Sequence, residues 1–233
     1  MNRSISGVAF SALFLIFLAP FAVGAQTITT ADGFFSSVSE AYEGIQDYSA
    51  NITITAMTGQ RKETMVGRVA FKKPDLLRID FTKPDEQTIV FTGKLLTIYL
   101  PEFNVVLNQS VESGSGTAGA SMATPQGLSL LKRYYAVSYE TGPEPVQLEE
   151  NSREKVVVLS LSRRSTTEIF RTIRLMISPE TKLIRRIDAR TISGDQVQFD
   201  FSGYDLNQGI LDNRFVYDSP ASANMFNDFL FNE

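Results

Sequence analysis

The spacing of hydrophobic positions changes soon after the start of the chain. Between Thr30 and Ile45 apolar residues recur every three to four positions, as in an amphipathic helix, and Thr30 is a candidate N-cap. From Tyr48 to Ala56 apolar and polar residues alternate, as in a strand with one buried face. The pattern therefore predicts an N-terminal helix followed by the first strand of a sheet.

Short alternating segments, separated by turn residues such as Thr58-Gly59-Gln60, fill most of the remaining chain. Such hairpin spacing favours an antiparallel meander over βαβ units. The predicted strands are Met65–Lys72, Leu76–Phe81, Gln87–Thr92, Leu95–Leu100, Val105–Gln109, Val156–Ser162, Phe170–Ser178, Leu183–Thr191 and Gln196–Tyr204.

Apolar and polar side chains alternate along these strands, so one face of the sheet is expected to be dry and the other solvated. In the second half of the chain the residues expected to face water are Arg174, Arg186, Asp188, Arg190, Gln198 and Asp200. About ten strands with one apolar face curl into an incomplete antiparallel β-barrel, and the dry face must be covered. The predicted fold class is therefore mainly β with an α-helical cover.

The segment Ser110–Thr124 interrupts this rhythm. It is rich in Gly and Ser, and it leads into Pro125–Tyr135, where leucines line one side of a short helix. The arrangement is typical of a mobile lid, and equally of a disordered loop before a packed helix. The tail, Phe215–Phe231, is expected to pack onto the sheet as a final amphipathic element.

Two short helices do not necessarily fill the dry face to the packing density of a protein interior. A shortfall would leave an apolar cavity, although the 17 Phe residues of the chain are bulky enough to fill it, and both outcomes stay open. The residues predicted to line the cavity are Ile52, Ile54, Val69, Phe71, Leu77, Ile79, Phe81, Ile89, Phe91, Ile98, Leu128, Leu131, Leu175 and Phe199.

The first 25 residues have the pattern of an export signal, with Arg3 near the start, an apolar core over Val8–Ala19 and small residues up to Ala25. The core is short for a bilayer interior of about 30 Å, so cleavage after Ala25 is predicted, with an uncleaved anchor as the alternative. Residues 26–233 then have the size of a single domain, exported to the periplasm.

Composition narrows the chemistry. The chain has no Cys and no His, which removes disulfides, the commonest general base and the commonest transition-metal ligand. A net charge of −4 gives no electrostatic footprint for nucleic acid and little attraction to anionic lipid by charge alone. Ser121 lies in the nearest match to a nucleophile elbow, but no histidine is present to activate it. No catalytic residue, metal or cofactor is predicted, and binding is favoured over catalysis.

The segment Gly67–Pro101 carries a specific resemblance. It contains Lys72-Lys73-Pro74, a Pro84-Asp85-Glu86 turn, a Gly93-Lys94 turn and a strand ending in Tyr99-Leu100-Pro101. Over these 35 residues the spacing resembles, without a gap, the LolA family of periplasmic outer-membrane lipoprotein carriers. The resemblance implies an incomplete barrel with a helical lid over an apolar cavity.

The resemblance also implies a function and a latch. Family members accept the acyl chains of lipoproteins from an inner-membrane ABC transporter and deliver them to the outer membrane, to an acceptor where one is present. A monomer is expected. Lys73 stands where the family typically has an Arg that contacts the lid, so Lys73 is the predicted lid latch, without the forked geometry of Arg. Thr92 and Thr97 replace the family's usual Asp and Trp.

Two other functions share this interpretation of the sequence. A lipid- or lipoprotein-sensing envelope regulator on the same fold would form a stable complex with a membrane protein instead of handing over cargo. Such regulators usually carry a second domain, for which the chain leaves little room. A hydrolase on a lipocalin-like barrel lacks the residues for catalysis.

Overall fold

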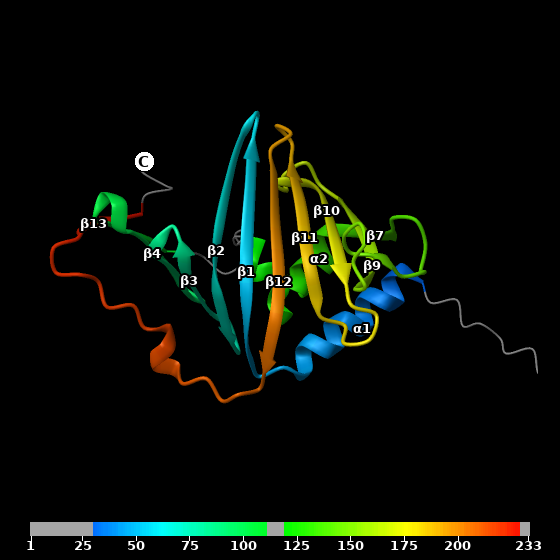
Figure 1. Cartoon of the computed structure of the whole chain (residues 1–233), viewed down its shortest axis with the longest axis horizontal. Coiled ribbons are helices and arrows are strands. Elements are labelled where there is room, and N and C mark those ends of the chain that lie inside the picture. The colour runs from blue at the N-terminus through cyan, green and yellow to red at the C-terminus, as the bar shows by residue number, and fades with distance from the viewer. Residues whose placement is uncertain (1–29, 111–118, 229–233) are drawn as a thin grey trace, which may run out of the picture.

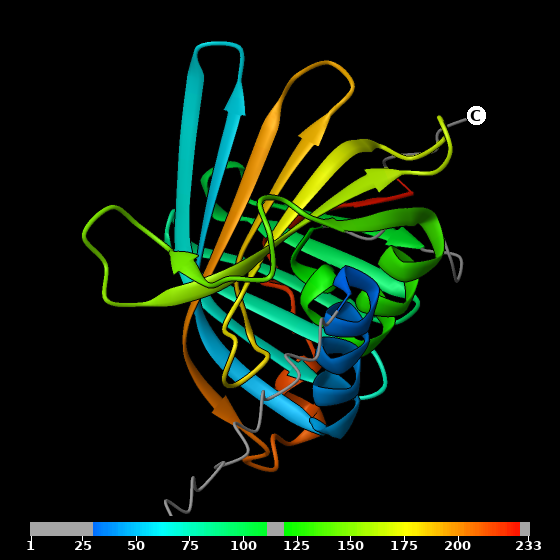
Figure 2. The same ribbon diagram turned by 90° about the vertical axis from the view of Figure 1, so that its right-hand side faces the viewer.

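A single curved sheet of 13 strands wraps around two helices in the computed structural model, which describes residues 30–110 and 119–228 (Figure 1). The strand order is β13-β6-β5-β4-β3-β2-β1-β12-β11-β10-β9-β7, and β8 pairs with β9 beside this path. The sheet does not close, because β13 and β7 are its two edges. The two helices lie inside its curve (Figure 2). The predicted incomplete antiparallel barrel with a helical cover is confirmed.

The strands of the first half are β1 (Asp47–Thr58), β2 (Arg61–Lys72), β3 (Leu76–Lys83), β4 (Asp85–Thr92), β5 (Leu95–Leu100) and β6 (Val105–Ser110). The second half contains β7 (Tyr135–Tyr139), β8 (Val146–Gln147), β9 (Lys155–Arg163), β10 (Phe170–Ile177), β11 (Ile184–Thr191), β12 (Gln196–Leu206) and β13 (Asn224–Asn227). The helices are α1 (Ala31–Gly44) and α2 (Pro125–Tyr134), with short 3-10 turns η1 (Pro101–Phe103), η2 (Gly119–Ala123) and η3 (Asp212–Phe215).

Helix α1 begins and ends where the sequence predicts. The Thr30 side chain accepts a hydrogen bond from the Gly33 backbone N–H at 3.1 Å, which satisfies one of the free donors of the first turn. The helix turns Phe35 and Val38 into the core, where both are fully buried. Within the described ranges neither helix has the length and apolar content needed to cross a bilayer.

The alternation of the strands is also confirmed in the first hairpin, where Val69 and Phe71 are fully buried and Arg68 is exposed. Strand β7 was missing from the prediction, because Tyr135 follows the last residue of α2 without a turn residue to mark the boundary. The backbone N–H of Arg164 donates to the Tyr134 carbonyl at 2.9 Å and links the end of α2 to the sheet.

The outer face of β10–β12 is less solvated than predicted. Asp188 was expected to face water, but it is only 6% exposed. The Arg174 guanidinium lies 3.4 Å from its carboxylate, and the Gln196 amide donates to it at 2.8 Å, so its burial is compensated. Acidic residues of the segment after β7 cover this face: Glu140, Glu149 and Glu154 pair with Arg174, Arg186 and Arg185.

The C-terminal tail forms a strap across the outer face of the sheet and ends as an edge strand, instead of the predicted amphipathic element. After β12 the chain runs through η3 to β13, which pairs in parallel with β6 (Figure 1). Phe215 is buried at 2% exposure, whereas Met225 and Phe226 on β13 are 58% and 54% exposed. Residues 229–231 of the predicted element lie outside the described residues.

One buried carboxylate fixes the start of this strap. Asp47, the first residue of β1, is 3% exposed. Its two oxygens accept hydrogen bonds from the backbone N–H groups of Gln208, Gly209 and Ile210, at 2.8 to 3.3 Å. Three donors aimed at one carboxylate compensate for its burial, so Asp47 connects the first strand to the chain that follows the last long strand.

Asp47→Ala is expected to lower the free energy of unfolding by about 2 kcal/mol, because three backbone N–H groups lose their buried acceptor. Asp212→Ala is the control, since that side chain is 80% exposed in its pair with Lys72 and should change the free energy by less than about 1 kcal/mol. Urea unfolding of both variants measures the difference. Equal effects would contradict the anchoring role of Asp47.

Candidate functional site

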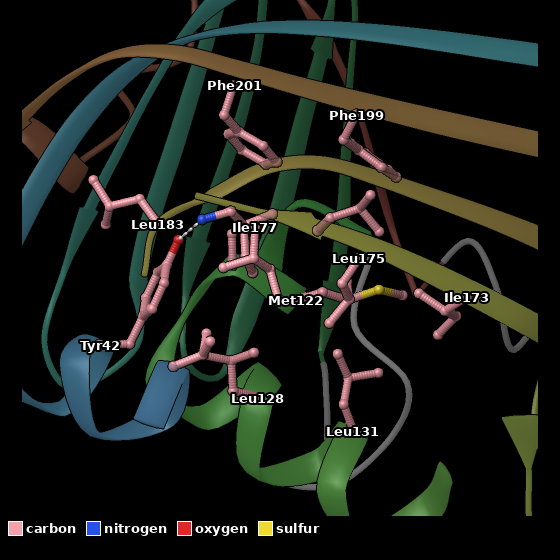
Figure 3. Close-up of a cluster of buried hydrophobic side chains, with 14 of the residues drawn as sticks. Tyr42, Met122, Leu128, Leu131, Ile173, Leu175, Ile177, Leu183, Phe199 and Phe201 are labelled. Carbon is pink, nitrogen blue, oxygen red and sulfur yellow. Dashed lines mark hydrogen bonds between the residues drawn. The ribbon is translucent and has the colours of Figure 1, made fainter. Parts of the chain in front are cut away.

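The inner face of the sheet and the two helices enclose one continuous apolar cluster. Its buried members are at most 8% exposed, so they pack together with little access to water. Figure 3 shows Tyr42 from α1 and Leu128 and Leu131 from α2 directed toward strands β10 to β12. The cover is thus part of the core, and among the described residues it comprises α1, α2 and the short turn η2.

The fourteen residues predicted to line a cavity are largely brought together in this cluster. Ile89 and Phe91 are partly buried against it, and Ile98 is partly buried outside it. The other eleven are buried members: Ile52, Ile54, Val69, Phe71, Leu77, Ile79, Phe81, Leu128, Leu131, Leu175 and Phe199. The inward faces of β1 to β4, β10, β12 and α2 therefore meet in one layer, as the alternation predicted.

Tyrosine hydroxyls at the boundary of this layer form hydrogen bonds that connect the sheet to α1 and to η2. The Tyr48 hydroxyl donates to the Ala123 carbonyl at 3.0 Å in a buried position. The Tyr42 hydroxyl accepts from the Ile184 backbone N–H at 3.1 Å, and the Tyr204 hydroxyl donates to the Ile184 carbonyl at 2.8 Å. Because each phenol has a partner, it can lie in apolar surroundings without the cost of an unpaired polar group.

We call η2 and α2 together the lid segment. Thr124 caps α2: its hydroxyl accepts from the Gly127 backbone N–H at 3.1 Å and donates to the Ser121 carbonyl at 2.7 Å. A Cβ at Gly127 would lie 2.0 Å from the Ser121 carbonyl oxygen, so only glycine allows η2 to approach the first turn of α2 this closely. The Lys132 ammonium donates to the Ser36 hydroxyl at 3.0 Å and links α2 to α1.

The predicted latch residue contacts a different helix. The Lys73 ammonium donates to the Glu43 carbonyl, in the last turn of α1, and not to the lid segment. A cation at a helix C-terminus is favourable because the last carbonyls carry partial negative charge. A buried hydrogen bond from the sheet to the lid segment comes from Tyr48 instead. The alternation of apolar and polar residues predicted that Tyr48 is a buried strand residue. No feature of the sequence predicted the hydrogen-bond partner of its hydroxyl.

A separate pocket of about 400 Å³ lies between α2 and the start of β10. Met122 and Leu131 belong both to its wall and to the apolar cluster, so the two regions adjoin. Leu131 is also the one predicted cavity residue in its lining. The lining residues are Ser121, Met122, Gly127, Leu130, Leu131, Tyr134, Tyr135, Thr167, Glu168, Ile169 and Phe170. Such a mainly apolar wall with a few polar groups suits an apolar ligand.

Comparison with known proteins gives consistent matches. The family model described as outer membrane lipoprotein carrier protein LolA matches residues 48–218. An outer-membrane lipoprotein carrier protein of Leptothrix cholodnii is 26% identical over 228 residues, covering 96% of this chain and 97% of that protein. One of Xanthomonas axonopodis pv. citri is 28% identical, covering 73% and 75%. The crystal structure of an uncharacterized conserved protein from Thermus thermophilus has 16% identity and a TM-score of 0.52, covering 82% of this chain and 98% of that one. This last likeness supports the fold alone.

Gly127→Ala is expected to lower the free energy of unfolding by about 2 kcal/mol, because the new methyl group forces η2 away from α2. Gly44→Ala, in the last turn of α1, is the matched control: a Cβ there meets nothing within 4 Å. The control should be neutral or stabilising by up to about 1 kcal/mol, as alanine favours a helix. Urea unfolding measures the free energy of unfolding of both variants. Similar changes in the two variants would refute the close packing of η2 on α2.

Alkaline pH is expected to destabilise the protein through Tyr42. Burial raises the pKa of Tyr42 from its usual 10.0 to about 12. Between these pH values the unfolded chain loses a phenol proton that the folded protein keeps, so the free energy of unfolding falls as pH rises through this window and is unaffected below it. Tyr42→Phe removes this contribution. Urea unfolding at a series of pH values should show a shallower decline for the variant, and parallel declines would contradict the assignment.

Proposed function

The chain belongs to the LolA family of outer membrane lipoprotein carrier proteins, and we propose that it binds the acyl chains of lipoproteins between its curved sheet and its two helices. One observation carries the proposal: the inward residues of β1 to β3 and β9 to β12 form a continuous apolar layer, and in the part of the chain that the structure describes α1, η2 and α2 lie over it. If α2 is displaced, this layer is available to another apolar group. Acyl chains are the group that the names of the relatives indicate.

The energetics suit a carrier. Each buried methylene group contributes about 0.8 kcal/mol, so an acylated anchor resists exposure to water by tens of kcal/mol. A carrier must shelter these chains and still release them, which requires a cover that can move at modest cost. The lid segment offers such a cover, because its hydrogen bonds to the sheet from Tyr48 to Ala123 and from Arg164 to Tyr134 are neutral contacts, and the second lies at the end of α2.

The pocket beside α2 supports a route for the ligand. It provides about 400 Å³ of space next to the apolar layer, and Met122 and Leu131 are among the residues that belong to both. Rotation of these two side chains, together with a shift of α2, would join the pocket to the space between sheet and helices. The acyl chains would then replace α2 contacts on the sheet and leave the sheet itself unchanged.

The wider role follows from the family. We propose one domain over residues 26–233, released into the periplasm by cleavage after Ala25; residues 1–25 lie outside the described residues. In this role the protein takes lipoproteins from an inner-membrane ABC lipoprotein-releasing transporter and passes them to the outer membrane, to an acceptor where one is present. It acts as a carrier and not as an enzyme. An envelope regulator on the same fold would bind lipid without passing it on.

Binding of a fluorescent fatty-acyl probe tests the site. Tyr48→Phe removes the hydrogen bond to the Ala123 carbonyl and keeps the ring, so lid opening should become easier by about 1 kcal/mol and probe uptake about fivefold faster. Tyr217→Phe, on the C-terminal strap, is the control and should leave uptake unchanged. Stopped-flow fluorescence gives the rates. Absence of probe binding to the unmodified protein would refute the proposed function, and equal rates for both variants would refute the role of the lid segment.

Transfer of cargo separates the carrier from the regulator. The protein loaded with an acylated lipoprotein should lose it to outer-membrane vesicles, measured as lipoprotein that sediments with the vesicles. Lipoprotein that stays bound to the protein would favour the regulator and contradict the carrier.

A further inference from the structure

Three hairpin ends lie at the same end of the sheet. The antiparallel pairing places the β1–β2 turn beside the β11–β12 turn, because Met57 is opposite Gln196 and Gln196 is opposite Arg190. Phe170 is opposite Thr191, so the β9–β10 connection is next in the row. Figure 2 shows these ends fanning out along one side of the molecule. The end of α2 is tied to the same place by the backbone bond from Arg164 to Tyr134.

Basic residues concentrate at this hairpin end, which we define as residues 57–63, 163–171 and 190–195 with Lys132 and Arg133 of α2. It contains eight basic and three acidic residues, a formal charge of +5, whereas the whole chain carries −4. The basic residues are Arg61, Lys62, Lys132, Arg133, Arg163, Arg164, Arg171 and Arg190, and the acidic ones are Glu63, Glu168 and Asp195. Positive charge is therefore concentrated at this end of a molecule whose net charge is negative.

These basic residues differ from those elsewhere in their pairing. On the outer face of the sheet Arg174, Arg185 and Arg186 all form ion pairs with acidic residues. At the hairpin end Arg61 pairs with Glu63. None of the other seven basic residues there forms an ion pair within residues 30–110 and 119–228. Lys132, Arg163 and Arg164 donate to neutral oxygen atoms, so within the described residues most of the positive charge at this end has no acidic partner and can attract an external one.

Each of the three hairpins also exposes an aliphatic side chain there. Met57, Ile169 and Ile192 are 39%, 62% and 59% exposed. Ile169 lines the pocket beside α2 as well, so the pocket lies at the hairpin end. Isolated exposed aliphatic residues are common on protein surfaces, but here one stands at each of three adjacent tips among cations that, Arg61 apart, have no acidic partner in the described residues. Cations that attract anionic headgroups, together with apolar side chains that enter the headgroup boundary, are the combination by which proteins bind to a bilayer surface.

We propose that the hairpin end is a docking surface for anionic phospholipid bilayers. The basic residues lie over the headgroups, the three aliphatic side chains enter the interface, and the pocket beside α2 faces the membrane. The inference goes beyond the proposed function: it assigns a membrane contact to a surface outside the apolar layer. A protein whose net charge is negative can still dock in this orientation, because only the charges within a Debye length of the membrane act on it.

Sedimentation with vesicles tests the proposal on the purified protein. The probes are vesicles of phosphatidylglycerol mixed equally with phosphatidylcholine, and vesicles of phosphatidylcholine alone. The unmodified protein should bind the anionic vesicles, bind the neutral ones weakly, and lose binding as salt is raised. In the triple variant Lys62→Gln/Arg171→Gln/Arg190→Gln, binding to anionic vesicles should fall by roughly tenfold to a hundredfold, since each basic residue near the surface contributes about fivefold.

A matched variant controls for overall charge. Lys94→Gln/Arg153→Gln/Lys155→Gln alters three exposed residues away from the hairpin end by the same total charge, and it should bind like the unmodified protein. Met57→Ser/Ile192→Ser should weaken binding severalfold, whereas Leu211→Ser/Val216→Ser, at 69% and 67% exposure on the strap, should not. Equal loss of binding in both triple variants would overturn the proposal. Absence of binding to anionic vesicles would overturn it too, and the partner of this surface would then be an acidic protein instead of a bilayer.

The acyl-probe assay on the same variants keeps this inference separate from the proposed function. Loss of vesicle binding with normal probe binding in solution supports a distinct docking surface. Probe binding that falls in parallel with vesicle binding would overturn it, because the substitutions would then act on the apolar site. Vesicle binding without probe binding would refute the proposed function and leave the docking surface in place.

Discussion

The structure depends on one constraint: a sheet that does not close must cover its apolar face with something other than itself. In a closed barrel each inward side chain packs against the opposite wall. Here the strand order runs from β13 to β7 without joining, so α1 and α2 occupy the interior. A cover made of helices is joined to the sheet by side-chain packing and a few hydrogen bonds, and not by a ladder of backbone bonds. In the proposed function the sheet is therefore the fixed part of the molecule, and the lid segment is the part that moves.

The polar contacts inside the molecule follow from the same constraint. The tyrosines Tyr42, Tyr48 and Tyr204 supply ring surface to the apolar layer and a hydroxyl at its boundary. A charged group in these positions would need a buried partner of opposite charge, at a large cost of desolvation. On the outer face of the sheet, by contrast, arginines and carboxylates pair freely. The inner face is thus apolar and the outer face carries ion pairs. At the hairpin end most of the cations have no acidic partner among the described residues.

Much of this arrangement could be predicted from the sequence, because it depends on local periodicity. The alternation in β1 to β6 and β9 to β12 identified the strands and the buried side chains, and Thr30 marked the start of α1. What depends on distant contacts was missed. Asp188 lies in a polar position of its strand, but residues from the segment after β7 cover it. Lys73 was placed on the lid by resemblance, whereas the fold brings it to the end of α1. The charge at the hairpin end was likewise hidden, since three distant turns meet only in the folded sheet.

The parallel pairing of β13 with β6 has a consequence for folding. Asn108 and Asn227 are hydrogen-bonded across 119 positions of sequence, so the edge of β6 stays uncovered until these two distant segments meet. An uncovered strand edge is a template for pairing with another chain. Strand β13 therefore protects β6 against self-association, and a chain cut before Asn224 would lack that protection although most of its core residues are present.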